Sequence, residues 1–265
     1  MHSAFGGTLH VYKTGQMIEL NKLEEIDMAD VHMHPELLRD LDQALEEARS
    51  IGIHIMIGAG TSAESSKKIV EISHTHAIFA TVGIAPDYAS SKPDLEFIEK
   101  MEGMIKKDRN IVGIGEIGLD TKIMERVSIQ EQKKVFERQL EIAQRLDMAV
   151  VIHSRGALHD VRKELKEMGI KKAIFHFYEG DEISAKEIEK DGYLISIPPL
   201  ESGRRKRVIK AIDIKSIVTE TDSPAATASP SEIPKVIEMI AKYKEMQFED
   251  VARITFENIR GYLYI

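Results

Sequence analysis

The sequence contains no cysteine, and this absence excludes disulfides, thiolate metal sites and cysteine nucleophiles. No apolar run approaches the roughly 20 residues that a membrane helix needs, so we expect no membrane association. The N-terminal stretch "MHSAFGGTLHVYKTGQ" has no basic start followed by a long apolar segment, which argues against a signal peptide. These absences together favour a cytoplasmic protein.

The chain also lacks an excess of basic residues, because its formal net charge is −8. A protein that binds nucleic acid mainly by counterion release is usually basic, so a nucleic-acid substrate would require metal ions to supply positive charge at the site. The one basic segment is "GRRKRVIK", from Gly203 to Lys210. It can be interpreted as a solvated start of a helix or as a contact with phosphate.

What the chain does have is a regular alternation of short apolar runs and longer charged, helix-period segments. Such short, nearly continuous apolar runs are typical of a parallel sheet that is buried on both faces. Eight runs in one α/β domain predict a TIM-type (β/α)₈ barrel, and a doubly wound open sheet is the alternative. We expect residues 27–265 to form this barrel and residues 1–26 to form an N-terminal extension or a cap. The runs lie near Ile26–Met33, Gly52–Ile57, Ile78–Ile84, Ile111–Ile114, Ala149–Ile152, Ala173–Phe177, Gly192–Ile197 and Ile217–Thr219.

In either fold the chemistry lies at the carboxyl ends of the strands, which makes histidine positions informative. His32 and His34 end the first run and share one strand face about 6.5 Å apart, so they could bind one metal ion. A second such pair, His74 and His76, precedes the third run and therefore belongs to the opposite end of the barrel. His54 falls within a run, where a hydrogen-bonded core histidine is expected.

Later runs also end in polar side chains. Glu116 follows apolar residues and is flanked by glycines, which would let the backbone crowd around a carboxylate. Arg155 follows the fifth run, and its guanidinium would suit a phosphate or carboxylate, whereas Asp120 is expected to be structural. The candidate ligands at the strand ends are His32, His34, Glu116, His153, His176 and Asp222.

Nitrogen and oxygen ligands without sulfur suit zinc, manganese or iron(II), and magnesium alone less well. Six ligands exceed the need of one catalytic ion that keeps an open position. They are typical of two divalent ions about 3.5–4 Å apart that share a bridging carboxylate. Glu116 is the best candidate for that bridge.

These pieces resemble the TatD-type metal-dependent deoxyribonucleases of the amidohydrolase superfamily. The matching stretches are "DVHMH", "GEIGLD", "QEQKKVFERQLEIAQRLDMAVVIHSRGA", "FHF" and "TETDSP", and they cover nearly the whole chain after residue 26. The resemblance implies a metallo-dependent hydrolase barrel in which His32, His34 and Asp222 hold one ion. It implies that His153 and His176 hold the other ion and that Asp222 also deprotonates the attacking water.

Three stretches depart from the family pattern. "GIAPDYA" stands where the family usually has "GxHPH", so that Ala85 and Asp87 replace two histidines near the substrate. "HFY" replaces "HCF", and "AATASPSEIPK" lacks the family's arginine- and asparagine-containing loop. The metal site is therefore expected to be intact, and the substrate site altered.

The sequence thus predicts a divalent-metal-dependent hydrolase that cleaves phosphodiester bonds, with Asp222 and Glu116 as catalytic residues and Arg155 as a substrate contact. Zinc, manganese or magnesium would serve as cofactor, and DNA ends or a small phosphodiester as substrate. One alternative keeps the metals and hydrolyses a C–N or ester bond. An aminoacyl-tRNA deacylase and a non-catalytic barrel are further alternatives. The oligomeric state is not predicted.

Overall fold

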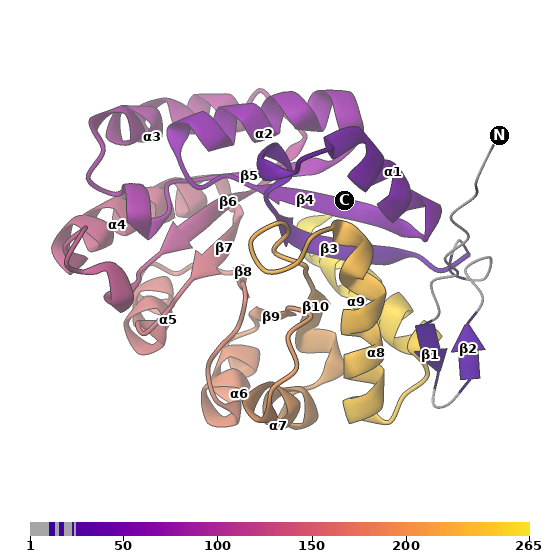
Figure 1. Cartoon of the computed structure of the whole chain (residues 1–265). Coiled ribbons are helices and arrows are strands. Elements are labelled where there is room, and N and C mark those ends of the chain that lie inside the picture. Colours follow the sequence, from indigo (N-terminus) through magenta and orange to yellow (C-terminus); the bar gives the residue numbers. More distant parts are fainter. Residues whose placement is uncertain (1–10, 14–15, 19–22, 24) are drawn as a thin grey trace.

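A nearly closed barrel of eight parallel strands dominates the computed structural model, which describes residues 11–13, 16–18, 23 and 25–265. Each strand pairs with its neighbours in sequence, so the open doubly wound alternative is wrong and the predicted barrel is confirmed (Figure 1). Each strand overlaps one predicted apolar run, although β6 is longer than predicted. The strands are β3 (Met28–Met33), β4 (Ile53–Ala59), β5 (Phe79–Val82), β6 (Ile111–Gly118), β7 (Ala149–His153), β8 (Ala173–Phe175), β9 (Leu194–Ile197) and β10 (Ile217–Thr219).

Helices follow the strands and surround the barrel (Figure 1). Short polar side chains begin several of them; Ser128, for example, forms a reciprocal capping box with Glu131 at the start of α4. The helices are α1 (Leu41–Ser50), α2 (Ala63–His76), α3 (Lys92–Ile105), α4 (Ile129–Leu146), α5 (Leu158–Glu167), α6 (Glu182–Lys190), α7 (Gly203–Ala211), α8 (Ile233–Lys244) and α9 (Phe248–Leu263). In the described part of the chain no helix is both long enough and apolar enough to cross a membrane.

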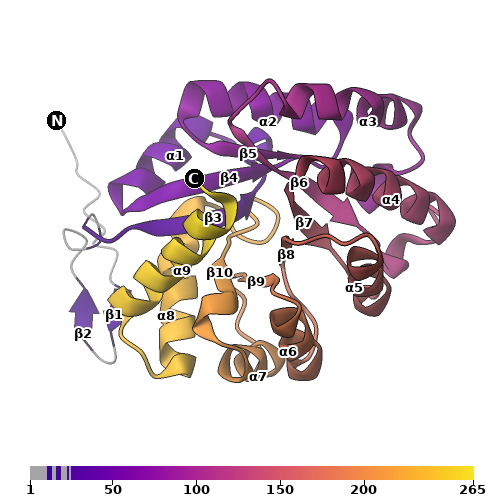
Figure 2. The same ribbon diagram turned by 180° about the vertical axis from the view of Figure 1, so that it is seen from behind.

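The hydrophobic core has two parts, because a barrel strand buries both of its faces. The larger part lies between the strands and the surrounding helices. The smaller part gathers alternate strand residues, such as Ala29 and Val31 of β3, with Ile259 of α9. Figure 2 shows α9 beside β3 and β10. The Tyr262 hydroxyl accepts a hydrogen bond from the Ala173 backbone at the start of β8, which places the end of α9 at the amino end of the barrel.

The first and last strands of the barrel, β3 and β10, meet through hydrogen bonds that lie partly outside the regular ladder. The hydroxyl of Thr219 donates to the carbonyl of Ala29 at 2.5 Å. The backbone N–H of Asp222 donates to the His32 carbonyl at 2.9 Å. We call this junction the seam, and it brings the end of β10 beside the end of β3.

Ahead of the barrel, β1 (Val11–Lys13) and β2 (Gln16–Ile18) form an antiparallel pair, and β1 contacts α8. Leu23 is buried, and its carbonyl lies against Gly52, where an added Cβ would approach to 2.6 Å. Residues 1–10, 14–15, 19–22 and 24 lie outside the described part. The division at residue 26 into an extension and a barrel domain therefore stays a prediction.

Candidate metal centre

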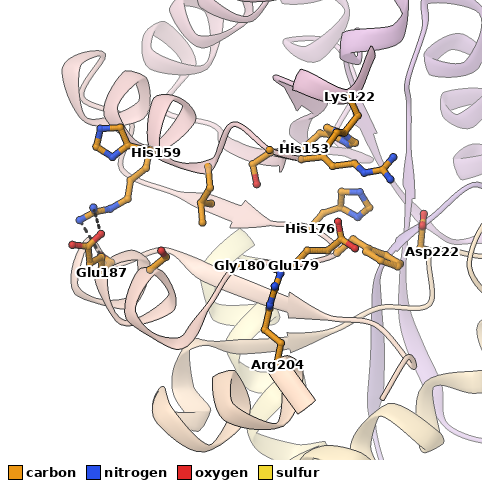
Figure 3. A pocket seen from close by; sticks show the side chains of 16 residues that line it. Lys122, His153, His159, His176, Glu179, Gly180, Glu187, Arg204 and Asp222 are labelled. Carbon is orange, nitrogen blue, oxygen red and sulfur yellow. Dashed lines mark hydrogen bonds and ion pairs between the residues drawn. The ribbon is translucent and has the colours of Figure 1, made fainter. Parts of the chain in front are cut away.

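The six predicted ligands converge at the carboxyl ends of the strands. His32 lies in β3 and His34 follows it, while Glu116 lies within β6 rather than after it. His153 is the last residue of β7, His176 directly follows β8, and Asp222 follows β10. Figure 3 shows three of them, His153, His176 and Asp222, at one end of a cavity.

Three groups of these side chains have ligand atoms within 4.8 Å of one another and could each hold a metal ion. Glu116 belongs to two groups, one with His32 and His34 and one with His153 and His176. The third group combines His32, His176 and Asp222. Glu116 is thus placed as a carboxylate between two sets of imidazoles, although His176 also lies close to the set around His32.

The carboxylate oxygens and imidazole nitrogens of the cluster lie close to one another. Glu116 Oε1 lies 2.7 Å from His153 Nδ1 and 3.6 Å from His176 Nε2. Its Oε2 lies 3.5 Å from Nε2 of His32. Asp222 Oδ1 lies 3.2 Å from Nε2 of His34. A divalent ion accepts this mixture of imidazole and carboxylate donors.

His32 provides a direct indication that the cluster fits a metal. Its side chain is fully buried, and neither ring nitrogen has a hydrogen-bond partner among the described residues. A buried polar group without a partner is costly in a folded protein. Coordination of a metal by one of these nitrogens would remove part of that cost, so the donor set and the burial both fit a bound cation.

Several ring nitrogens are fixed by groups outside the cluster. His34 donates through Nδ1 to the Ala59 carbonyl at 3.1 Å, and Nδ1 of His176 lies 3.3 Å from Oε2 of the fully buried Glu220. Such contacts orient a metal-binding imidazole and select its tautomer.

Asp120 makes the corresponding contact with His153, at 3.0 Å from Nε2. It also accepts the backbone N–H of Lys122 and so begins the short helix η4 (Thr121–Ile123). The sequence indicated only a structural role for Asp120. Its place four residues after Glu116 in "GEIGLD" could have indicated this contact too.

The carboxylates and imidazoles of the cluster shift one another's pKa values. Burial opposes ionisation of Glu116, but the charge of His176 and the hydrogen bond with His153 hold the pKa of Glu116 well below its usual value. Burial alone would lower the pKa of His153, yet Asp120 and Glu116 raise that pKa to about 10. Metal binding by His153 at neutral pH would therefore displace a proton from its imidazole.

The glycines around Glu116 do allow close approach of the backbone, as predicted. A Cβ on Gly115 would lie 2.6 Å from the Val151 side chain. Gly118 has a φ of +146°, and a Cβ there would lie 1.9 Å from the His153 carbonyl oxygen. Glycine at these two positions lets β6 and β7 bring Glu116 and His153 together.

The predicted substrate-side residues divide into two groups. Arg155 lines the cavity that opens from the cluster, and its side chain is exposed. Ala85 is buried. Asp87 forms an ion pair with Arg126, and it is not in any of the three metal-binding groups. The charge of Asp87 is thus neutralised by a neighbour instead of facing the cluster alone.

Three described histidines outside the cluster, His54, His74 and His76, pair with carboxylates. His74 and His76 lie in the last turn of α2, before β5, where they pair with Asp108 and Asp42. They are remote from the strand ends that carry the cluster, as predicted. The prediction for His54 is wrong, because its side chain is 47% exposed and pairs with Asp27 instead of packing in the core.

Comparisons with known proteins agree with this geometry. The pattern of a family described as TatD related DNase matches residues 29–263. An uncharacterized metal-dependent hydrolase of Methanocaldococcus jannaschii is 32% identical over 251 residues, which cover 89% of this chain and 96% of that protein. The human deoxyribonuclease TATDN3 is 30% identical over 258 residues, covering 88% and 93%.

Among solved structures, YjjV, a TatD homologue of Escherichia coli, aligns with a TM-score of 0.81. The alignment covers 90% of this chain and 98% of that one at 20% identity, so it bears on the fold alone. The family match spans the barrel and every residue of the cluster. The chain is a metal-dependent hydrolase and belongs to the TatD related DNase family.

Proposed function

We propose that this protein is a phosphodiesterase that removes nucleotides from DNA ends with the help of two divalent metal ions. The observation that carries the proposal is the cluster of six nitrogen and oxygen donors in which Glu116 is shared between two imidazole groups. A shared carboxylate is typical of two-metal sites that act on phosphate esters. The name of the human relative, a deoxyribonuclease, supports DNA as the substrate.

In this proposal His32, His34 and Asp222 would hold one ion, His153 and His176 would hold the other, and Glu116 would contribute its carboxylate to both. Zinc or manganese suits imidazole donors best, and magnesium is the remaining candidate. The unpartnered ring of His32 supports occupancy by a metal. The contacts that Ala59, Asp120 and Glu220 make with the imidazoles would keep these rings oriented toward the ions.

When bound, the ions would lower the pKa of a water molecule toward neutrality and balance negative charge on the phosphate. Asp222 would accept a proton as the general base. Burial raises the pKa of Asp222, but its hydrogen bond with His34 and the nearby charge of His176 bring the pKa below its usual value. At neutral pH the carboxylate is therefore ionised and able to accept a proton.

Arg155 would hold a non-bridging oxygen of the substrate. Its guanidinium is exposed in the cavity next to the cluster, and among the described residues it makes no side-chain hydrogen bond or ion pair. Such a group is free to bind a phosphate through two parallel N–H donors. The relatives do not favour the alternative of a C–N or ester hydrolase.

The test compares two small substrates in metal-depleted protein that is reloaded with zinc, manganese or magnesium. We expect hydrolysis of bis-p-nitrophenyl phosphate and release of nucleotides from single-stranded DNA, with little turnover of p-nitrophenyl acetate. Metal analysis should give about two ions per chain. Preferred cleavage of the acetate, or a metal content near zero in the active protein, would contradict the proposal.

A further inference from the structure

A cavity of about 870 Å³ opens from the metal cluster, between the connections that follow β6, β7, β8 and β9. We call it the flanking cavity. Figure 3 shows His176 and Asp222 at its inner end and His159 with Glu187 at its outer end. Its volume is within the roughly 300–1,000 Å³ of small-molecule sites, so it exceeds what a single phosphate group needs.

Cations from three different connections line the flanking cavity: Lys122 of η4, Arg155 after β7, and Arg204 in the first turn of α7. The side chains of Lys122 and Arg155 make no hydrogen bond or ion pair with other described residues. Arg204 donates one N–H group to the Glu179 carbonyl, at 2.9 Å. None of these three side chains forms an ion pair among the described residues, although Arg155 acts on the charge of Asp120 and Arg204 on that of Asp181. They are available to an anion.

At the outer end of the cavity the cation does have carboxylate partners. Arg162 is neutralised there, because it pairs with Glu187 at 2.7 Å and with Asp191 at 2.5 Å. Positive charge that forms no ion pair is therefore concentrated near the metal cluster, where Lys122, Arg155 and Arg204 outnumber the exposed carboxylate of Glu179. The net charge of the chain is −8, so this positive region is a local exception, and it would attract a polyanion.

Phe177 adds an aromatic face to the same wall. It follows His176, lines the cavity and is partly exposed. Its φ of +45° is unusual for a residue other than glycine, and its N–H donates to the buried carboxylate of Glu220 at 2.6 Å. This bond holds the backbone in the conformation that places the ring in the cavity.

We propose that the flanking cavity is a second nucleotide subsite, in which Lys122 and Arg204 bind the phosphate next to the scissile one and Phe177 stacks on its base. The inference rests on the proposed function and adds a preference to it. The enzyme should act on DNA strands with at least two phosphodiesters much better than on a small diester. A basic groove with an aromatic platform is a common arrangement for single-stranded nucleic acid.

Binding measurements test the subsite separately from catalysis. The probe is a fluorescent, phosphorothioate-linked tetrathymidylate, which resists hydrolysis, added to the metal-loaded protein. Lys122→Ala and Arg204→Ala should each raise its Kd about three- to tenfold at low salt. Each should also reduce the slope of log Kd against log salt by about 0.7, the value for one lost phosphate contact on a single strand.

Matched variants control for the change of charge. Lys210→Ala and Arg207→Ala alter exposed residues of α7 that do not line the cavity, so both should leave Kd and the salt slope unchanged. Phe177→Leu should weaken binding about fivefold or more, since leucine lacks the stacking face, and Phe177→Tyr should retain it. These differences concern affinity and its salt dependence, which a merely local structural role would not alter in this pattern.

Unchanged Kd and salt slope in Lys122→Ala and Arg204→Ala would overturn the subsite, as would equal effects in the two control variants. Hydrolysis of bis-p-nitrophenyl phosphate by the unaltered enzyme is measured alongside. If that hydrolysis is present while the binding pattern fails, the proposed function stands and only the subsite is wrong. If hydrolysis is absent, the proposed function fails first.

Discussion

A single imidazole, that of His32, links the fold to the chemistry of the site. Its ring stacks on that of His176, with centroids 3.7 Å apart, and both of its nitrogens are buried without a hydrogen bond. Burial lowers the pKa of His32, with the neighbouring charge of His176 acting in the same direction. The neutral ring that results is the form that coordinates a metal.

His32→Ala should therefore lower both metal content and phosphodiester hydrolysis. Loss of groups that only orient a metal ligand costs about 10–100-fold, so loss of this ligand should cost about 100-fold or more. Metal analysis and a hydrolysis assay on the same preparation check this. His74→Ala, at the other end of the barrel, is the control and should change neither quantity. Full activity in His32→Ala would disprove its assignment as a ligand.

Asp120 allows a finer test, because it touches the cluster only through His153. Asp120→Asn keeps a side-chain oxygen that can accept the Lys122 N–H but removes the charge beside His153. Metal affinity should fall about 10-fold, within the range for groups that orient a ligand. Titration with a competing chelator measures this. An unchanged affinity would restrict Asp120 to its capping role.

At the scale of elements, helix α4 positions the loops that surround the site. Gln139 is fully buried and bridges one loop residue, since its Oε1 accepts the Ile84 N–H at 2.7 Å and its Nε2 donates to the Ile84 carbonyl at 3.0 Å. About two turns closer to the helix start, Gln132 does the same for both backbone groups of Asp120. The apolar face of α4 thus includes two amides that fix the chain after β5 and after β6.

Gln139→Leu should destabilise the protein by about 2–4 kcal/mol, because two buried backbone groups of Ile84 lose their partners. Gln130→Leu is the matched control, since Gln130 is an exposed residue of the same helix. Its effect should stay within about 0.5 kcal/mol. Urea unfolding of both variants gives the comparison. Equal free energies of unfolding would show that the bridge to Ile84 contributes no stability.

At the scale of the whole molecule, the sequence predicts what depends on local pattern. Apolar runs locate the strands, and the rule that strand ends carry chemistry selects all six donors of the cluster. Local pattern does not predict which distant segments of the chain contact each other. The seam bond of Thr219, for example, joins residues 190 positions apart, and the flanking cavity lies between four connections of the chain at once.

The seam also determines where half of the metal cluster lies, because it brings Asp222 to the end of β3. Thr219→Val keeps the shape of the side chain and removes its hydrogen bond to the Ala29 carbonyl. We expect a loss of about 1–2 kcal/mol in the free energy of unfolding.

Metal affinity should decrease together with this loss of stability, since Asp222 follows Thr219 by three residues and hydrogen-bonds to the His32 carbonyl. Thr81→Val is the matched control, as Thr81 is equally buried and makes a longer bond of 3.4 Å to Gly58 between β5 and β4. It should cost less stability and leave metal affinity unchanged. If the two variants behaved alike in both measurements, closure of the barrel at Thr219 would have no special connection to the metal centre.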